Sequence, residues 1–254
     1  LWWATQNDLL QPLESAVLTE NIPEYLRDPE DRWFGLSVRA RTIVYSPERA
    51  DARMLSSYEG LADPMWRGRL CLRTSKKVYN QSLVASMIAN DGEQQAETWA
   101  RGFVANFARP PKGGDRDQIK AAAAGQCDIA IANTYYVGAM LAGKDEEQKA
   151  AAEKMGLFWP NQQGRGTHVN VSGIGMTTAA RNTDNAKKLM EYLVSEKAQK
   201  WYAEVNHEYP VRAGVAWGDI LKSWGEFKAD TLNLSKLGEL NADAVRLMDR
   251  AGWK

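Results

Sequence analysis

The segment CDIAIAN (127–133) most constrains the fold, because the apolar residues from Ile129 to Ala132 leave no polar face along it. A strand of this kind is buried on both faces of its sheet, as happens when helices cover both sides. Strands and helices alternate along much of the remaining chain. We therefore predict an α/β protein with largely parallel sheets.

The other expected elements follow from the hydrophobic periodicity. In the strand FGLSVRARTIVYS, a period of two residues places Ser37, Arg39 and Arg41 on one face. The predicted strands cover 34–46, 68–74 and 166–178, and the predicted helices cover 79–90, 93–108, 115–126, 184–205 and 241–254.

A repeated spacing in the sequence relates two cysteines to three tyrosines. Cys71 lies eight residues before Tyr79, and Cys127 lies eight residues before Tyr135, which Tyr136 follows. Both units read as strand, turn, tyrosine and helix. In a parallel sheet this geometry brings the tyrosines to the carboxyl ends of their strands, where open α/β folds bind ligands. We therefore predict that the three tyrosines are neighbours in a cleft.

The same spacing predicts that Cys71 and Cys127 approach each other at the amino ends of adjacent parallel strands. The distance between adjacent strands is close to the separation that a disulfide needs. Two outcomes stay open, a disulfide bond formed in an oxidising compartment or two buried thiols.

Composition excludes several classes of protein. Lys+Arg 32 against Asp+Glu 32 gives no net charge, so no overall field draws the chain to nucleic acid or to an anionic membrane. No apolar run is long enough to span a membrane. The first residues lack the features of a signal peptide, so we expect that any export signal was removed or never included. His168 and His207 are expected to be structural or surface residues.

Three converging phenols suit few chemical tasks. Acid–base catalysis favours groups with a pKa near 7, whereas the pKa of a free tyrosine is about 10. A hard, highly charged cation favours anionic oxygen ligands and expels their protons. Three phenolates would balance the charge of ferric iron, and Arg39 or Arg41 could hold a further anion beside it.

Four segments also resemble a known family: WFGLSVRARTIVYS, RTSKKVYNQSLVASMI, GQCDIAIANTYYVGAM and GTHVNVSGIGMT. They are similar to the periplasmic ferric-ion-binding proteins of bacterial ABC importers, including the cyanobacterial type. The resemblance implies a type II periplasmic-binding-protein fold, in which two α/β lobes joined by two crossing strands close on the ligand. It also implies a periplasmic monomer that binds Fe(3+), is not an enzyme, binds no nucleic acid and delivers iron to an ABC permease in the inner membrane.

The resemblance assigns roles to six residues. Tyr79, Tyr135 and Tyr136 match the tyrosine iron ligands. Arg39 matches an arginine beside the metal, which in some members helps to hold a synergistic anion such as carbonate. Candidates for supporting these groups from the next shell are Asn80 and Asn133.

The resemblance further divides the chain into lobes. The N-terminal lobe would comprise residues 1–41 and 166–216, and the lobe that carries the tyrosines would comprise 42–165 and 217–254. Family members begin with several dozen residues before the position of Leu1, and these supply strands of the first lobe. We therefore expect an incomplete first lobe here.

Three rival interpretations remain. The nearest keeps the fold but changes the ligand to an anion, a polyamine or a thiamine-like molecule held by tyrosine walls. An enzyme is a second interpretation, although G-x-S-x-G, H-E-x-x-H and a phosphate-cradling glycine loop are all absent. A third is the ligand-sensing half of a regulator, for which no helix-turn-helix is visible.

Overall fold

The computed structural model describes residues 1–254, which pack into two compact units. Unit 1 comprises Leu1–Arg39, Val169–Gly225 and Thr231–Glu239, and unit 2 comprises Ala40–His168, Glu226–Asp230 and Leu240–Lys254. The boundary between Arg39 and Ala40 falls inside the long strand β2 (Phe34–Tyr45).

The sheet of unit 2 has the strand order β3-β4-β2-β5, built from β3 (Leu70–Cys71), β4 (Ile129–Asn133), the second half of β2 and β5 (Gly156–Phe158). β3 and β4 are parallel, with Leu70 opposite Ile129. β2 is antiparallel to both β4 and β5. The predicted parallel sheet is therefore wrong for β2. A parallel pair needs a long crossover, and in this sheet the helices between β3 and β4 provide one.

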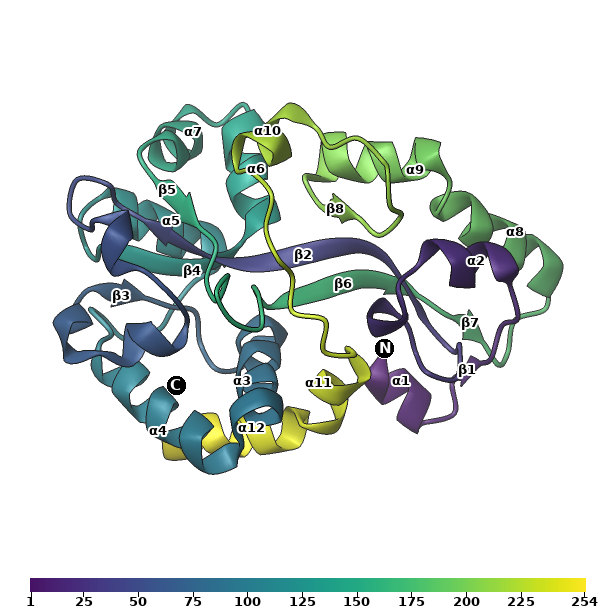
Figure 1. Cartoon of the computed structure of the whole chain (residues 1–254), viewed down its shortest axis with the longest axis horizontal. Helices are drawn as coiled ribbons and strands as arrows, with labels where there is room; N and C mark the ends of the chain where they lie inside the picture. The colour runs from purple at the N-terminus through teal and green to yellow at the C-terminus, as the bar shows by residue number, and fades with distance from the viewer. The chain divides into compact units, whose positions relative to one another are not determined.

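Two groups of helices cover this sheet. The first group is α3 (Val78–Asp91), α4 (Glu93–Ala105) and α12 (Asn241–Arg250), and the second is α5 (Asp115–Ala123), α6 (Thr134–Ala142) and α7 (Glu146–Glu153). Figure 1 shows the first group below β3 and β4 and the second group towards the top of the unit. Every residue of β4 is buried, as the unbroken apolar run of its sequence predicts.

Aromatic residues fill the core under the first group of helices. Trp99 stacks on Phe103 with ring centroids 4.9 Å apart, and Trp253 lies 5.3 Å from Phe103 and 5.5 Å from Phe107. The indole nitrogen of Trp253 donates a hydrogen bond to the carbonyl oxygen of Arg73 at 2.9 Å. This bond ties the C-terminal segment to the chain that leaves β3.

Unit 1 contains short strands and small helices. β1 (Leu10–Gln11) pairs with β7 (Met176–Thr177), and the first half of β2 pairs with β6 (Val169–Ile174) and β8 (Tyr209–Pro210). The helices are α1 (Trp2–Gln6), α2 (Ala16–Asn21), α8 (Thr183–Leu193), α9 (Glu196–Trp201), α10 (Asp219–Ser223) and α11 (Ser235–Glu239). In residues 1–254 no helix combines the length and the apolar character that crossing a membrane requires.

Two sequence-based expectations about these helices need correction. The helix predicted over 184–205 is broken into α8 and α9, because the Ser195 side chain caps the start of α9 by accepting from the Ala198 amide. The resemblance implies that 217–254 belongs as a whole to the lobe of the tyrosines, but α10 and α11 pack within unit 1. α11 packs on α1, where Gly238 leaves room for the Trp2 indole.

Cys71 and Cys127 form a disulfide with a Cα–Cα distance of 5.9 Å. The predicted proximity is confirmed, and of the two open outcomes the structure has the bond. Cys127 precedes β4, as predicted, whereas Cys71 is the last residue of the two-residue strand β3 rather than its amino end. The bond ties β3 to the chain entering β4.

Reducing this disulfide should destabilise unit 2. The bond joins residues 56 positions apart, and closing a loop of that size typically stabilises a domain by about 2–4 kcal/mol. We expect the free energy of unfolding, measured with denaturant, to fall by about that amount when reductant is added. Titration of the unfolded, unreduced protein should find no free thiol.

The control for this experiment is the double variant Cys71→Ala, Cys127→Ala, whose stability should not respond to reductant. Two titratable thiols in the unreduced parent protein would contradict the prediction.

Candidate functional site

The three tyrosines are brought together in unit 2 by the ends of the two parallel strands. Tyr79 is the second residue of α3, and Tyr135 and Tyr136 are the second and third residues of α6, which begins directly after β4. The Tyr135 hydroxyl donates a hydrogen bond to the Tyr79 hydroxyl at 3.1 Å. The ring of Tyr136 lies 4.3 Å from that of Tyr135 and 6.4 Å from that of Tyr79, between centroids. All three side chains are half-buried.

Three arginines surround the phenol rings. The guanidinium carbons of Arg73 and Arg41 lie 5.3 Å and 5.9 Å from the centroid of the Tyr79 ring. The exposed Arg116 lies 5.9 Å from the centroid of Tyr136. Cations at this range attract the electron-rich face of a phenol ring and also stabilise negative charge on its oxygen. The cluster is therefore suited to hold phenolates.

The electrostatic environment differs among the tyrosines. Burial raises the pKa of Tyr135, and so do its hydrogen bonds to Tyr136 and Tyr79. For Tyr136, burial acts to raise the pKa, but hydrogen bonds from Tyr135, Tyr79 and Arg73 outweigh it and lower the pKa below its usual value. The hydrogen bonds that Tyr136 accepts therefore favour negative charge on its oxygen.

A buried polar network lies behind the tyrosines. Asp115, the first residue of α5, is fully buried, and its carboxylate accepts hydrogen bonds from Arg41 and Arg73, each at 3.0 Å. The same carboxylate accepts from the backbone amide of Asn133 at 2.8 Å. Arg41 also donates to the side-chain oxygens of Asn80 at 2.6 Å and Asn133 at 2.9 Å. The network therefore reaches both segments that carry tyrosines.

Arg39 belongs to unit 1 and has partners there. Its guanidinium pairs with the buried carboxylate of Glu208 at 3.2 Å and donates to the Ser172 hydroxyl at 2.5 Å. Ser37 and Ser172 also donate to Glu208. Glu208 thus anchors the arginine that the sequence singled out.

Sequence reasoning missed Arg73, Asp115 and Glu208. Arg73 carried a usable signal, since it lies between β3 and Tyr79 and so at the same strand end as the tyrosine. Asp115 and Glu208 had none, because their partners are distant in sequence: Asp115 pairs with Arg41 and Glu208 with Arg39. Both histidines are buried, and burial together with Arg41 and Arg165 lowers the pKa of His168 to about 3.

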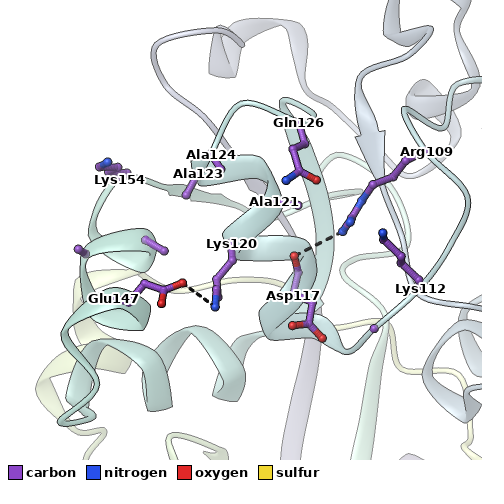
Figure 2. Close-up of a pocket in the computed structure, with 13 residues that line it drawn as sticks. Arg109, Lys112, Asp117, Lys120, Ala121, Ala123, Ala124, Gln126, Glu147 and Lys154 are labelled. Atoms are coloured by element: carbon purple, nitrogen blue, oxygen red, sulfur yellow. Dashed lines mark hydrogen bonds and ion pairs between the residues drawn. The ribbon is translucent and has the colours of Figure 1, made fainter.

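A separate pocket of about 610 Å³ lies beside α5 and α7. Figure 2 shows charged side chains around it, with Lys120 pointing to Glu147, to which it is ion-paired at 2.7 Å, and Arg109 donating to the carbonyl oxygen of Asp117. None of the three tyrosines lines this pocket. It is therefore distinct from the tyrosine cluster.

Several known proteins are similar to this chain in sequence and in structure. Iron uptake protein A1 of Synechocystis sp. (strain ATCC 27184 / PCC 6803 / Kazusa) is 51% identical over 254 residues, which is all of this chain and 71% of that protein. The structure "Trichodesmium (IdiA) (FutA) in complex with iron and citrate ligands" matches with a TM-score of 0.98 and 51% identity, over 100% of this chain and 80% of that chain. "Apo FutA2 from Synechocystis PCC6803" matches with a TM-score of 0.96 and 47% identity, over 100% of this chain and 81% of that chain.

These likenesses confirm both the predicted type II periplasmic-binding-protein fold and the resemblance on which it depended. The model of one family, described as bacterial extracellular solute-binding protein, matches residues 3–228. That match extends over most of the chain and includes all three tyrosines. The chain belongs to the bacterial extracellular solute-binding protein family.

Proposed function

We propose that this chain is the substrate-binding component of an ABC importer, which binds ferric iron through Tyr79, Tyr135 and Tyr136 and delivers it to a permease in the inner membrane. The observation that carries the proposal is the cluster of three phenols, joined by the 3.1 Å hydrogen bond between Tyr135 and Tyr79 and flanked by arginines. Similar proteins are named for iron uptake or ferric iron binding, and one similar structure contains iron.

The chemistry of the cluster supports this ligand. Ferric iron is a hard cation that prefers anionic oxygen donors, and three phenolates match its charge of three. The neighbouring guanidiniums of Arg41 and Arg73 stabilise the phenolates, which otherwise would repel one another at this distance. Reduction to the ferrous ion removes one unit of charge and weakens binding, which offers one route to release.

The proposal includes location and partners. A disulfide between Cys71 and Cys127 suits the oxidising periplasm, and the family is described as extracellular. The chain acts there as a monomer that hands iron to the permease, without chemical turnover. A synergistic anion such as carbonate completes the coordination, with Arg39 as its partner and with Asn80 and Asn133 supporting the ligands.

Replacing each tyrosine by phenylalanine tests the proposed coordination. Tyr→Phe removes only the donor oxygen and keeps the ring, so Tyr79→Phe, Tyr135→Phe and Tyr136→Phe should each shift or abolish the visible phenolate-to-iron charge-transfer band. Ferric affinity should fall by more than the roughly 10–100-fold that follows loss of a group supporting a metal ligand. Competition with a chelator measures the affinity.

The control is Tyr192→Phe, at a tyrosine exposed on α8 of unit 1, which should leave band and affinity unchanged. If all three site variants bind iron as the parent does, the tyrosines are walls of a pocket for another solute and the proposal is wrong.

Iron binding should weaken as the pH falls. Most phenols are protonated near neutral pH, so binding a ferric ion releases their protons and acid opposes it. We expect affinity to fall about tenfold per pH unit for each proton released. Competition titrations at several pH values, corrected for protonation of the chelator, measure this slope, and Tyr79→Phe should reduce it by about one proton.

An affinity that does not change with pH would show that the phenols do not ionise on binding. In that case the ligand set would need to be sought elsewhere.

Arg39 should affect how strongly ferric binding depends on an added anion. Arg39→Gln removes the planar fork that fits carbonate or a carboxylate, so ferric binding should weaken and should respond less to added carbonate. The matched control is Arg32→Gln, because Arg32 is a similarly exposed arginine paired with a buried carboxylate, Asp28. If both variants keep the parental affinity and carbonate dependence, Arg39 has no part in binding.

A further inference from the structure

One buried guanidinium makes contact with both tyrosine-bearing segments. Arg41 is 2% exposed and lies on β2. One of its terminal nitrogens donates to Asn80, which directly follows Tyr79, at 2.6 Å. The other donates to Asn133, which precedes the Tyr135–Tyr136 pair and is the N-cap residue of α6, at 2.9 Å. A single side chain therefore links the start of α3 to the start of α6.

The orientation of this guanidinium is fixed by Asp115. The carboxylate accepts from Arg41 at 3.0 Å and from the backbone amide of Asn133 at 2.8 Å through the same oxygen, Oδ2. Its other oxygen accepts from Arg73 at 3.0 Å. Because Asp115 is fully buried, water does not compete for these bonds. Arg41 therefore has one preferred orientation.

Stability alone does not account for such a network. A buried ion pair is costly to desolvate, and apolar residues of similar volume often stabilise a protein as well or better. The planar fork of arginine, however, can hold two acceptors at a fixed separation, which a lysine cannot do. What this arrangement provides is a defined distance between Asn80 and Asn133, and so between the tyrosines next to them.

We propose that Arg41 is a positioning residue, which clamps the start of α3 to the start of α6 and holds the three phenols at the spacing of the iron site before iron arrives. This inference rests on the proposed function. A metal site requires its ligands to be held within about 0.5 Å of their working geometry. A clamp made of hydrogen bonds that do not involve the metal removes the cost of ordering two separate segments on binding.

The sharpest test compares two buried asparagines. The side-chain nitrogen of Asn80 donates to the carbonyl oxygens of Arg73 and Thr74, at 3.0 Å and 3.1 Å. The side-chain nitrogen of Asn106 likewise donates to two carbonyl oxygens, of Leu61 and Asp63, at 2.9 Å and 2.7 Å. Of these two asparagines, only Asn80 also accepts a hydrogen bond from Arg41. Asn106→Ala is therefore a matched control for Asn80→Ala.

Asn80→Ala should lose somewhat more stability than Asn106→Ala, because it also removes an acceptor of the buried Arg41 guanidinium, and the two variants should differ at the iron site. We expect Asn80→Ala to weaken ferric binding about 10–100-fold, the range for groups that orient metal ligands, and to shift the charge-transfer band. Asn106→Ala should leave both unchanged. In the metal-free protein, hydrogen exchange at the first turns of α3 and α6 should speed up in Asn80→Ala and not in Asn106→Ala.

A third variant separates charge from geometry. Arg41→Lys keeps the positive charge but cannot span both asparagines, so it should show the weaker binding, the shifted band and the faster exchange. If Arg41→Lys or Asn80→Ala matches the Asn106→Ala control in all three measurements, Arg41 is not a clamp. Should the parent protein show no phenolate band, the proposed function fails, while exchange in the metal-free variants still decides the clamp.

Discussion

The buried carboxylate of Asp115 is the constraint on which the arrangement of unit 2 depends. A carboxylate removed from water costs several kcal/mol unless charged donors surround it. Asp115 obtains them from Arg41 on β2 and from Arg73 after β3, and it also accepts from the amide of Asn133 at the end of β4. These three contacts fix three strands relative to the start of α5. That arrangement determines the positions of the three tyrosines.

The cluster of three tyrosines could be predicted from the sequence, since its cause is local. Cys71 and Cys127 precede Tyr79 and Tyr135 by the same number of residues. In two adjacent parallel strands, residues that lie equally far along the chain from paired positions occupy neighbouring positions in space. Equal spacing therefore predicts that the tyrosines lie together and that the cysteines lie within reach of each other, and the structure has the hydrogen bond and the disulfide. Periodicity likewise identified β4 as fully buried.

What could not be predicted depends on partners distant in the chain. Nothing around Asp115 or Glu208 indicates that Arg41 and Arg39 will pair with them, because each pair is joined only by the tertiary fold. The antiparallel direction of β2 and the packing of α11 in unit 1 likewise depend on contacts between distant parts of the chain. α11 packs where Gly238 makes room for Trp2, a fit between the two ends of the chain that no local pattern reveals.

Charge connects this buried network to the proposed cargo. Exchanging three phenolic protons for one trivalent ion leaves the formal charge of the cluster unchanged. Before any further anion binds, Asp115 and the guanidiniums of Arg41 and Arg73 would then experience the same net charge with and without iron. A ferrous ion in the same place would leave the cluster one unit more negative. With Tyr79, Tyr135 and Tyr136 as the proposed ligands, the fixed charges around them would favour the ferric state, because only a trivalent ion matches the charge of the three protons it replaces.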